Sequence, residues 1–172
     1  MARADRDLQW IGLLQREASV RKSTKRPGHD IKLATNGIIK GKVMTKEEFN
    51  KKRREYRKRT GNKATRRYEK TVNGYLMRTY RNMKSRVTGV QWKKAHLYEG
   101  KSLLPKQDFY DWALESDEFR TLFINWSLSG YDRKLSPSIN RIDPDKGYEL
   151  GNIEWLTHSE NSSLGGRRKA IR

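Results

Sequence analysis

Cysteine is absent from this chain of 172 residues, apolar residues are scarce, and acidic residues are few beside the basic ones. The absence of cysteine excludes disulfide bonds and thiolate metal sites. No apolar run approaches the roughly 20 residues that span a bilayer. The first residues, which include Asp5 and Asp7, do not resemble a signal peptide. We therefore expect no membrane association and a cytoplasmic location.

The low apolar content limits how much of the chain can pack into a core. Hydrophobic residues make up 34% of the sequence, a low share for one compact domain of this length. We expect one modest core with solvated segments around it.

Basic residues dominate the charged ones. Lysine and arginine total 39 against 20 aspartate and glutamate residues, which gives a formal net charge of +19. Such a chain has the electrostatic character of a nucleic-acid-binding protein. A membrane-surface protein or a partner of an acidic protein is a weaker interpretation.

Residues 1–44 show little periodic apolar signal. The segment 8–14 has apolar residues for one face of a short helix, 21–28 is a basic linker ending in Pro-Gly, and 38–43 allows a short strand at most. We interpret 1–44 as a basic N-terminal arm, partly disordered.

A helical body is predicted over 45–130. Thr45 and Glu48 form a capping box for a helix to about residue 59. Few acidic residues intersperse its bases, so a polyanion contact is favoured over a merely solvated surface. Its candidate DNA-binding residues are Lys51, Lys52, Arg53, Arg54, Arg57 and Lys58.

The rest of this body has helical spacing throughout. An apolar stripe indicates a helix over about 64–87, in which Gly74 introduces a bend. Two more helices are predicted after Pro105 and after Ser116 or Asp117, the second ending at Gly130. Basic residues off the stripe are further candidates to track a nucleic-acid backbone: Arg78, Arg81, Lys84 and Arg86.

A hairpin followed by a helix is predicted in 131–166, before a basic tail at 167–172. Strand-like runs at 138–142 and 152–156 flank a turn rich in Pro, Asp, Lys and Gly. Thr157 or Ser159 caps the helix, and Gly165-Gly166 is expected to stop it. The predicted fold class is α+β: a small helical body with a C-terminal hairpin-helix motif and a basic arm.

The hairpin carries three short motifs that resemble the HNH nucleases of the His-Me finger superfamily. They are Asn140-Arg141-Ile142-Asp143, Asn152-Ile153-Glu154-Trp155 and Ser159-Glu160-Asn161. They are most similar to phage-type homing endonucleases, and pieces at 80–86, 109–112 and 136–138 extend the resemblance to about 45–165. The resemblance implies a ββα-metal motif and a phage-encoded protein of the host cell cytoplasm.

By this resemblance Asn140 and Asn161 match the metal-ligand positions, and Asn152 matches the asparagine that braces the loop. The implied cofactor is one Mg²⁺ (or Mn²⁺) per active site, because amide oxygens are hard ligands that suit Mg²⁺. Each asparagine alone has an ordinary interpretation as a turn or cap residue. The three together, at the spacing of the family, favour the metal site.

Arg141 departs from the family pattern, because it stands where the general-base histidine would be. A guanidinium with a pKa above about 12 cannot accept a proton at neutral pH, but it can hold a phosphate and stabilise its charge. Another group must then activate the water: Tyr148, His158 or hydroxide on the metal. For His158 a solvent-facing place at the helix start is an equal alternative.

Two hypotheses about function follow. The first is a metal-dependent DNA endonuclease that hydrolyses phosphodiester bonds in double-stranded DNA, of the phage homing type. The alternative is a noncatalytic basic DNA- or RNA-binding protein derived from a nuclease. Net charge does not separate them, and the asparagines around Arg141 favour the enzyme. Neither the oligomeric state nor the recognition sequence follows from the sequence.

Overall fold

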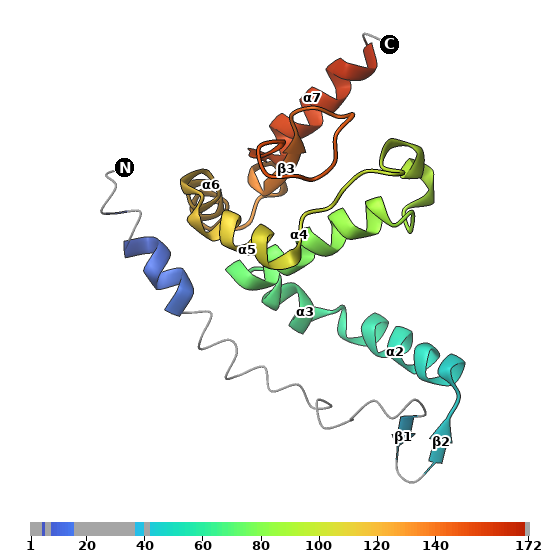
Figure 1. The fold of residues 1–172 in the computed structure, drawn as a ribbon. Coiled ribbons are helices and arrows are strands. Elements are labelled where there is room, and N and C mark those ends of the chain that lie inside the picture. The colour runs from blue at the N-terminus through green and yellow to red at the C-terminus, as the bar shows by residue number, and fades with distance from the viewer. Residues whose placement is uncertain (1–4, 6–7, 16–36, 40–41, 171–172) are drawn as a thin grey trace.

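The computed structural model describes residues 5, 8–15, 37–39 and 42–170 (Figure 1). The prediction of partial disorder in the N-terminal arm falls mainly on 16–36, outside the described residues. Residues 8–15 are helical, as the apolar spacing of this segment predicted. Trp10 is buried, and its ring contacts Phe119 and Phe123 edge to face, with centroids 6.0 Å apart in each pair. This part of the arm therefore packs on the body.

The architecture is mostly helical with two small antiparallel hairpins, an α+β arrangement. The first hairpin pairs β1 (Gly37–Ile39) with β2 (Lys42–Met44), and the second pairs β3 (Pro137–Arg141) with β4 (Ile153–Thr157). The α-helices after β2 are α2 (Lys46–Thr60), α3 (Lys63–Tyr68), α4 (Val72–Val87), α5 (Lys106–Glu115), α6 (Asp117–Leu128) and α7 (His158–Ala170). Two 3-10 helices, η1 (Trp92–Leu97) and η2 (Arg133–Leu135), lie in the connections. No helix in the described part of the chain is long and apolar enough to cross a membrane.

Helix α2 begins as the sequence predicted. Thr45 accepts a hydrogen bond from the backbone N–H of Glu48, and Glu48 accepts one from the backbone N–H of Thr45, so the capping box is confirmed. The helix ends at Gly61, whose φ of 58° is in the left-handed region. None of its residues is buried, so α2 is an exposed basic helix.

The single bent helix predicted over 64–87 is wrong, because α3 and α4 are separate helices. Thr71 is the N-cap of α4: its hydroxyl accepts from the N–H of Gly74 and donates to the carbonyl of Tyr68. A Cβ on Gly74 would lie less than 3.0 Å from the carbonyl oxygen of Tyr68. Gly74 therefore allows the end of α3 to pack on the first turn of α4, and it does not bend a continuous helix.

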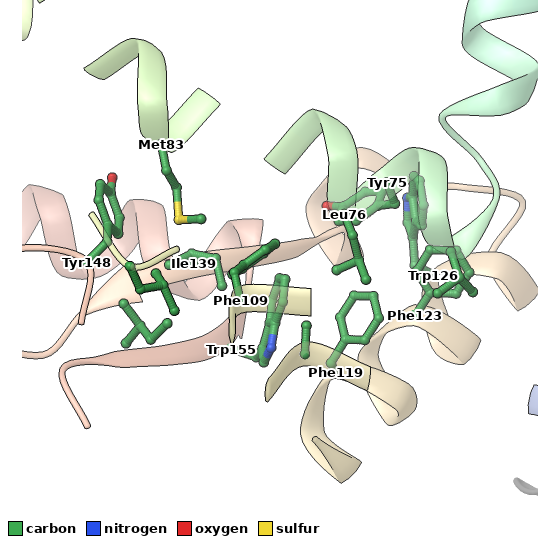
Figure 2. Packing of buried hydrophobic residues seen from close by; sticks show 14 of the residues in the cluster. Tyr75, Leu76, Met83, Phe109, Phe119, Phe123, Trp126, Ile139, Tyr148 and Trp155 are labelled. Atoms are coloured by element: carbon green, nitrogen blue, oxygen red, sulfur yellow. The ribbon is translucent and has the colours of Figure 1, made fainter. Parts of the chain in front are cut away.

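One core joins the helices to the second hairpin. Figure 2 shows side chains from α4, α5 and α6 meeting Ile139 and Trp155 of the hairpin. Phe119 lies 4.6 Å from Trp155 between ring centroids, and Trp112 stacks on Trp155 at 5.6 Å and 10°. The hydroxyl of Tyr75 on α4 donates to the carbonyl of Pro137 at the start of β3. The helical body therefore fixes the position of the hairpin.

Helix α7 follows β4 directly. Thr157 caps it, because its hydroxyl accepts from the N–H of Glu160 at 3.2 Å while the Glu160 carboxylate accepts from the N–H of Thr157 at 2.8 Å. The Thr157 hydroxyl also donates to the Glu160 carboxylate at 2.7 Å, and these bonds from the hydroxyl and the N–H of Thr157 hold the pKa of Glu160 below its ordinary value. The predicted stop at Gly165-Gly166 is wrong, since α7 continues to Ala170.

Candidate functional site

The two faces of the β3–β4 hairpin have different environments. Ile139 pairs with Trp155 on the face that packs into the core. Successive side chains in a strand alternate between faces, so Ser138, Asn140 and Glu154 share the other face. An asparagine of α7 reaches this face and bonds to Ser138. The candidate site is therefore the space between this face and α7.

Asn140 lies near the end of β3, directly opposite Glu154 of β4. Its side chain is buried, and its Nδ2 donates to Oε1 of Glu154 at 2.6 Å. The amide nitrogen is thus held by a carboxylate. No protein donor among the described residues bonds to Oδ1 of Asn140, so this oxygen is available to a ligand.

Asn161 is presented by the first turn of α7. Its Nδ2 donates to Oγ of Ser138 at 2.8 Å and to the carbonyl oxygen of Ile139 at 3.0 Å. These bonds place Asn161 beside β3. Its two acceptors belong to the two residues that directly precede Asn140. Its Oδ1 likewise receives no hydrogen bond from the described part of the protein. The two asparagines that the resemblance matches to metal-ligand positions therefore lie on the same side of the hairpin.

Asn152 has a structural place in the turn between the strands. It is buried, its Oδ1 accepts from the N–H of Asp143 at 2.9 Å, and its Nδ2 donates to the carbonyls of Asp143 and Gly147 at 3.1 and 2.8 Å. All of its side-chain atoms that form hydrogen bonds are used within the turn. Asn152 therefore braces residues 143–147 and does not face the space beside α7.

Arg141 is held away from the two asparagines. Alternation along β3 directs it to the face opposite Asn140, and its guanidinium donates to the carbonyl of Lys146 at 2.8 Å and of Leu97 at 3.5 Å. Its Cζ lies 4.4 Å from the ring centroid of Tyr98 and 5.6 Å from that of Tyr148. In this arrangement Arg141 links the turn to η1.

Tyr148 is a core residue, with a side chain that is 1% exposed. Its hydroxyl accepts from Nη1 of Arg86 at 3.0 Å, and its ring stacks on Tyr98 at 5.9 Å and 9°. Burial raises the pKa of Tyr148 to about 12, although the neighbouring Arg86 acts in the opposite direction. The prediction that Tyr148 activates a water has no support in this geometry, because a buried neutral phenol is a poor base.

His158 opens α7, one turn before Asn161. Its backbone N–H donates to the carbonyl of Ser136, and its Nδ1 lies 3.4 Å from Oγ of Ser162. Residues three apart lie on the same face of a helix, so His158 and Asn161 face the same side of α7. The ring is half-buried. Of the two side chains proposed to activate water, His158 is the better placed.

The predicted DNA-binding residues differ in their surroundings. The basic residues of α2 are exposed to solvent. On α4, Arg78 and Arg81 form ion pairs with Glu69 at 3.5 and 3.3 Å, while Lys84 is exposed. Nη1 of Arg86 donates to the hydroxyl of the buried Tyr148, and Nε of Arg86 is buried with no hydrogen-bond partner. Arg86 thus supports the hairpin, and α2 provides the exposed basic surface.

Glu154 is the residue of the site to which the sequence analysis assigned no role. Its carboxylate holds Asn140 and lies on the face that Asn161 approaches. Pairing the two predicted strands end to end would have placed residue 154 opposite 140. No group of three or more His, Cys, Asp or Glu residues that could hold a metal occurs in the described ranges. Any metal at this place would therefore depend on amide oxygens assisted by Glu154.

The donor set fits a small hard cation. Two amide oxygens without protein donors and one carboxylate are the ligand types that Mg²⁺ and Mn²⁺ accept, with the remaining positions left to water or a phosphate.

The chain was also compared with models of known protein families, with curated proteins and with solved structures, and none of them matches it.

Proposed function

We propose that this chain is a metal-dependent DNA endonuclease of the HNH type, which hydrolyses phosphodiester bonds in double-stranded DNA. The observation that carries the proposal is the way in which the side-chain amides of Asn140 and Asn161 are held on the same side of the hairpin. Each amide nitrogen is bound by a protein acceptor, and each amide oxygen remains available. A protein that only binds DNA has no need of this arrangement.

In the proposed site Asn140 and Asn161 would hold Mg²⁺ or Mn²⁺ through their oxygens, and Glu154 would add negative charge. When bound, the cation supplies Lewis acidity and neutralises charge on the phosphate. His158 accepts the proton of the attacking water. To reach the phosphate, the Arg141 guanidinium would have to leave Tyr98 and the carbonyls of Lys146 and Leu97, and it would then stabilise the negative charge. Asn152 keeps the turn in shape.

The exposed bases of α2 support DNA as the substrate. Six of them fall within eight residues of a helix that buries none of its side chains. Such a surface binds the phosphate backbone without reading sequence. By its resemblance to phage-type homing endonucleases, the chain is proposed to be phage-encoded and to act in homing.

One observation favours a second function, a noncatalytic DNA- or RNA-binding protein derived from a nuclease. Arg141 replaces the expected histidine and is stacked on Tyr98, on the opposite face of β3 from Asn140. If that arrangement persists on DNA, the guanidinium supports the fold and the site lacks its phosphate ligand.

Nicking of supercoiled plasmid tests the proposal. Wild type with Mg²⁺ or Mn²⁺ should convert the plasmid to open circles, and EDTA should abolish the reaction. Asn161→Ala should lose about 100-fold or more of this rate, because removing even an indirect supporter of a metal ligand costs about 10–100-fold. Asn125→Ala is the matched control, since Asn125 is an exposed asparagine of α6.

A further variant separates metal binding from folding. Asn161→Asp keeps an oxygen at the same distance from the backbone and should retain metal-dependent nicking. Equal nicking by wild type and Asn161→Ala would contradict the metal assignment. No nicking by wild type on many DNA targets would favour the noncatalytic function.

A further inference from the structure

The segment 88–97, between α4 and α5, exposes the two most exposed large apolar side chains of the described residues. Trp92 is 75% exposed and Val90 is 73% exposed. The other four tryptophans lie in or against the core, and Trp112 stacks on Trp155. A tryptophan buries about 150–250 Å² when it packs, so leaving this one in solvent forgoes a large stabilisation. An exposed indole of this size makes the segment a candidate contact for a partner.

This segment is held in place by the body. The N–H of Gln91 donates to the carbonyl of Ser85 at 3.2 Å, and Oγ1 of Thr88 donates to the carbonyl of Lys84 at 2.8 Å. At the other end, the carbonyl of Leu97 accepts from Arg141. Trp92 therefore lies on an anchored segment. Because the segment is already ordered, binding a partner loses less conformational entropy.

The surroundings of Trp92 select a polyanion as the partner. The segment contains Lys93, Lys94 and His96 and no acidic residue. Nζ of Lys93 lies 5.4 Å from the Trp92 ring centroid. A base beside a phosphate offers both a π-face for the indole and a negative charge for the ammonium. A purely apolar protein surface would leave the lysine without a counterion.

We propose that Trp92 inserts at a base step of the double-stranded DNA that the proposed endonuclease binds and stacks on a base there, on the Arg141 side of the hairpin. The inference rests on DNA as the partner and not on cleavage. Its location follows from Arg141, which bonds to both the turn of the hairpin and the end of η1. Trp92 then anchors the DNA on one side of the hairpin while the α2 bases bind its backbone.

The test measures both affinity and the exposure of the indole, with a mixed-sequence duplex as the probe. Trp92→Ala should weaken binding roughly tenfold, because stacking of one base on an aromatic ring is worth about that factor or more. Trp92→Phe should weaken it less, since it keeps an aromatic face. Leu128→Ala, which removes an apolar residue of α6 that is 64% exposed, should change nothing.

Salt dependence separates stacking from charge. Trp92→Ala should leave the slope of log affinity against log salt unchanged, whereas Lys93→Gln should reduce its magnitude by about 0.9. Acrylamide quenching gives a direct readout: the Trp92 contribution, obtained by subtracting Trp92→Phe, should be shielded when DNA binds. Equal affinities for wild type and Trp92→Ala, or quenching unchanged by DNA, would overturn the proposal.

The outcomes distinguish this proposal from that of the enzyme. If Asn161→Ala loses nicking and Trp92→Ala binds DNA as wild type does, only the stacking proposal is contradicted. If DNA shields Trp92 in a protein that nicks no target, only the endonuclease proposal is contradicted. A wild type that binds no DNA overturns both.

Discussion

The side chains of Asn140 and Asn161 are oriented by bonds to their nitrogens. Glu154 accepts from one amide, and Ser138 with Ile139 accepts from the other. Because each nitrogen is fixed, each oxygen has a defined direction. The site is preorganised by neutral and acidic groups of the protein itself.

Glu154 gives the first prediction at this scale. Glu154→Gln keeps an oxygen that accepts from Asn140 but removes the negative charge. We expect the Mg²⁺ concentration for half-maximal nicking to rise by about 10-fold or more, as for other groups that support metal ligands, with little change in thermal unfolding. Glu149→Gln is the control, because Glu149 lies in the turn and bonds to Ser102. Equal Mg²⁺ dependence in wild type and Glu154→Gln would contradict this role.

Tyr148 gives a prediction about pH. Its pKa is about 12 in the folded protein against 10.0 ordinarily, so the folded state holds the phenol proton more tightly. Its contribution to the free energy of unfolding is full below pH 10 and is lost as pH rises from 10 to about 12. The loss is on the order of 3 kcal/mol.

Urea unfolding at pH 8 and pH 11 checks this expectation. Tyr148→Phe lacks the titrating group and should lose less stability between the two pH values than wild type does. It should also be less stable at pH 8 by about 1–3 kcal/mol, because Arg86 loses the acceptor for its buried guanidinium. The same alkaline loss in both proteins would show that Tyr148 does not titrate in this way.

At the scale of elements, helix ends decide the arrangement. Thr45, Thr71, Ser116 and Thr157 each accept a backbone N–H at a helix start. The cap at Thr157 begins α7 directly after β4, which places Asn161 beside β3. The cap at Thr71 separates α3 from α4 and depends on the close approach of Gly74 to Tyr68.

Gly74→Ala tests that approach. The added Cβ would overlap the Tyr68 carbonyl, and we expect a loss of about 1–3 kcal/mol in the free energy of unfolding, as for other overpacked sites. Gly12→Ala is the matched control, since Gly12 is also helical and has no atom within 4 Å of an added Cβ. It should be neutral or stabilising by up to about 1 kcal/mol. Urea denaturation of both variants gives the comparison.

For the whole molecule, charge and core are separated in space. The core lies among α4, α5, α6 and the second hairpin, whereas α2 buries no residue. Affinity for DNA and stability of the fold should therefore respond to different substitutions. This separation gives a prediction for the complete chain.

A variant with Gln at all six basic positions of α2 tests this separation. The altered residues are Lys51, Lys52, Arg53, Arg54, Arg57 and Lys58. If wild type neutralises about six phosphates, the slope of its log affinity for DNA against log salt concentration should be about −5. The variant should show a much shallower slope. Thermal unfolding of the core should be the same in both. Gln at Arg133 and Lys134, two exposed bases of η2, is the control; an unchanged slope in the α2 variant would contradict the role of this helix.

The sequence by itself determined the features that depend on neighbours along the chain. The capping box at Thr45 and the two strands near 138–142 and 152–156 were predicted, because hydrogen bonds between residues three apart and alternation within a strand are local. The caps at Ser116 and Thr157 were each predicted as one of two alternatives, with Asp117 and Ser159 as the others. The same locality explains two errors in the predicted helix boundaries. Spacing alone did not reveal the close packing that ends α3, and a Gly-Gly pair did not by itself stop α7.

Only the tertiary structure decided what surrounds the candidate site. The bond from Asn140 to Glu154 depends on register, and the bonds from Asn161 to β3 depend on how α7 docks. The place of Arg141 on Tyr98 depends on residues more than forty positions apart, which no local pattern connects. The burial of Tyr148 has the same origin, because the energy of packing is set by neighbours in space and not along the chain.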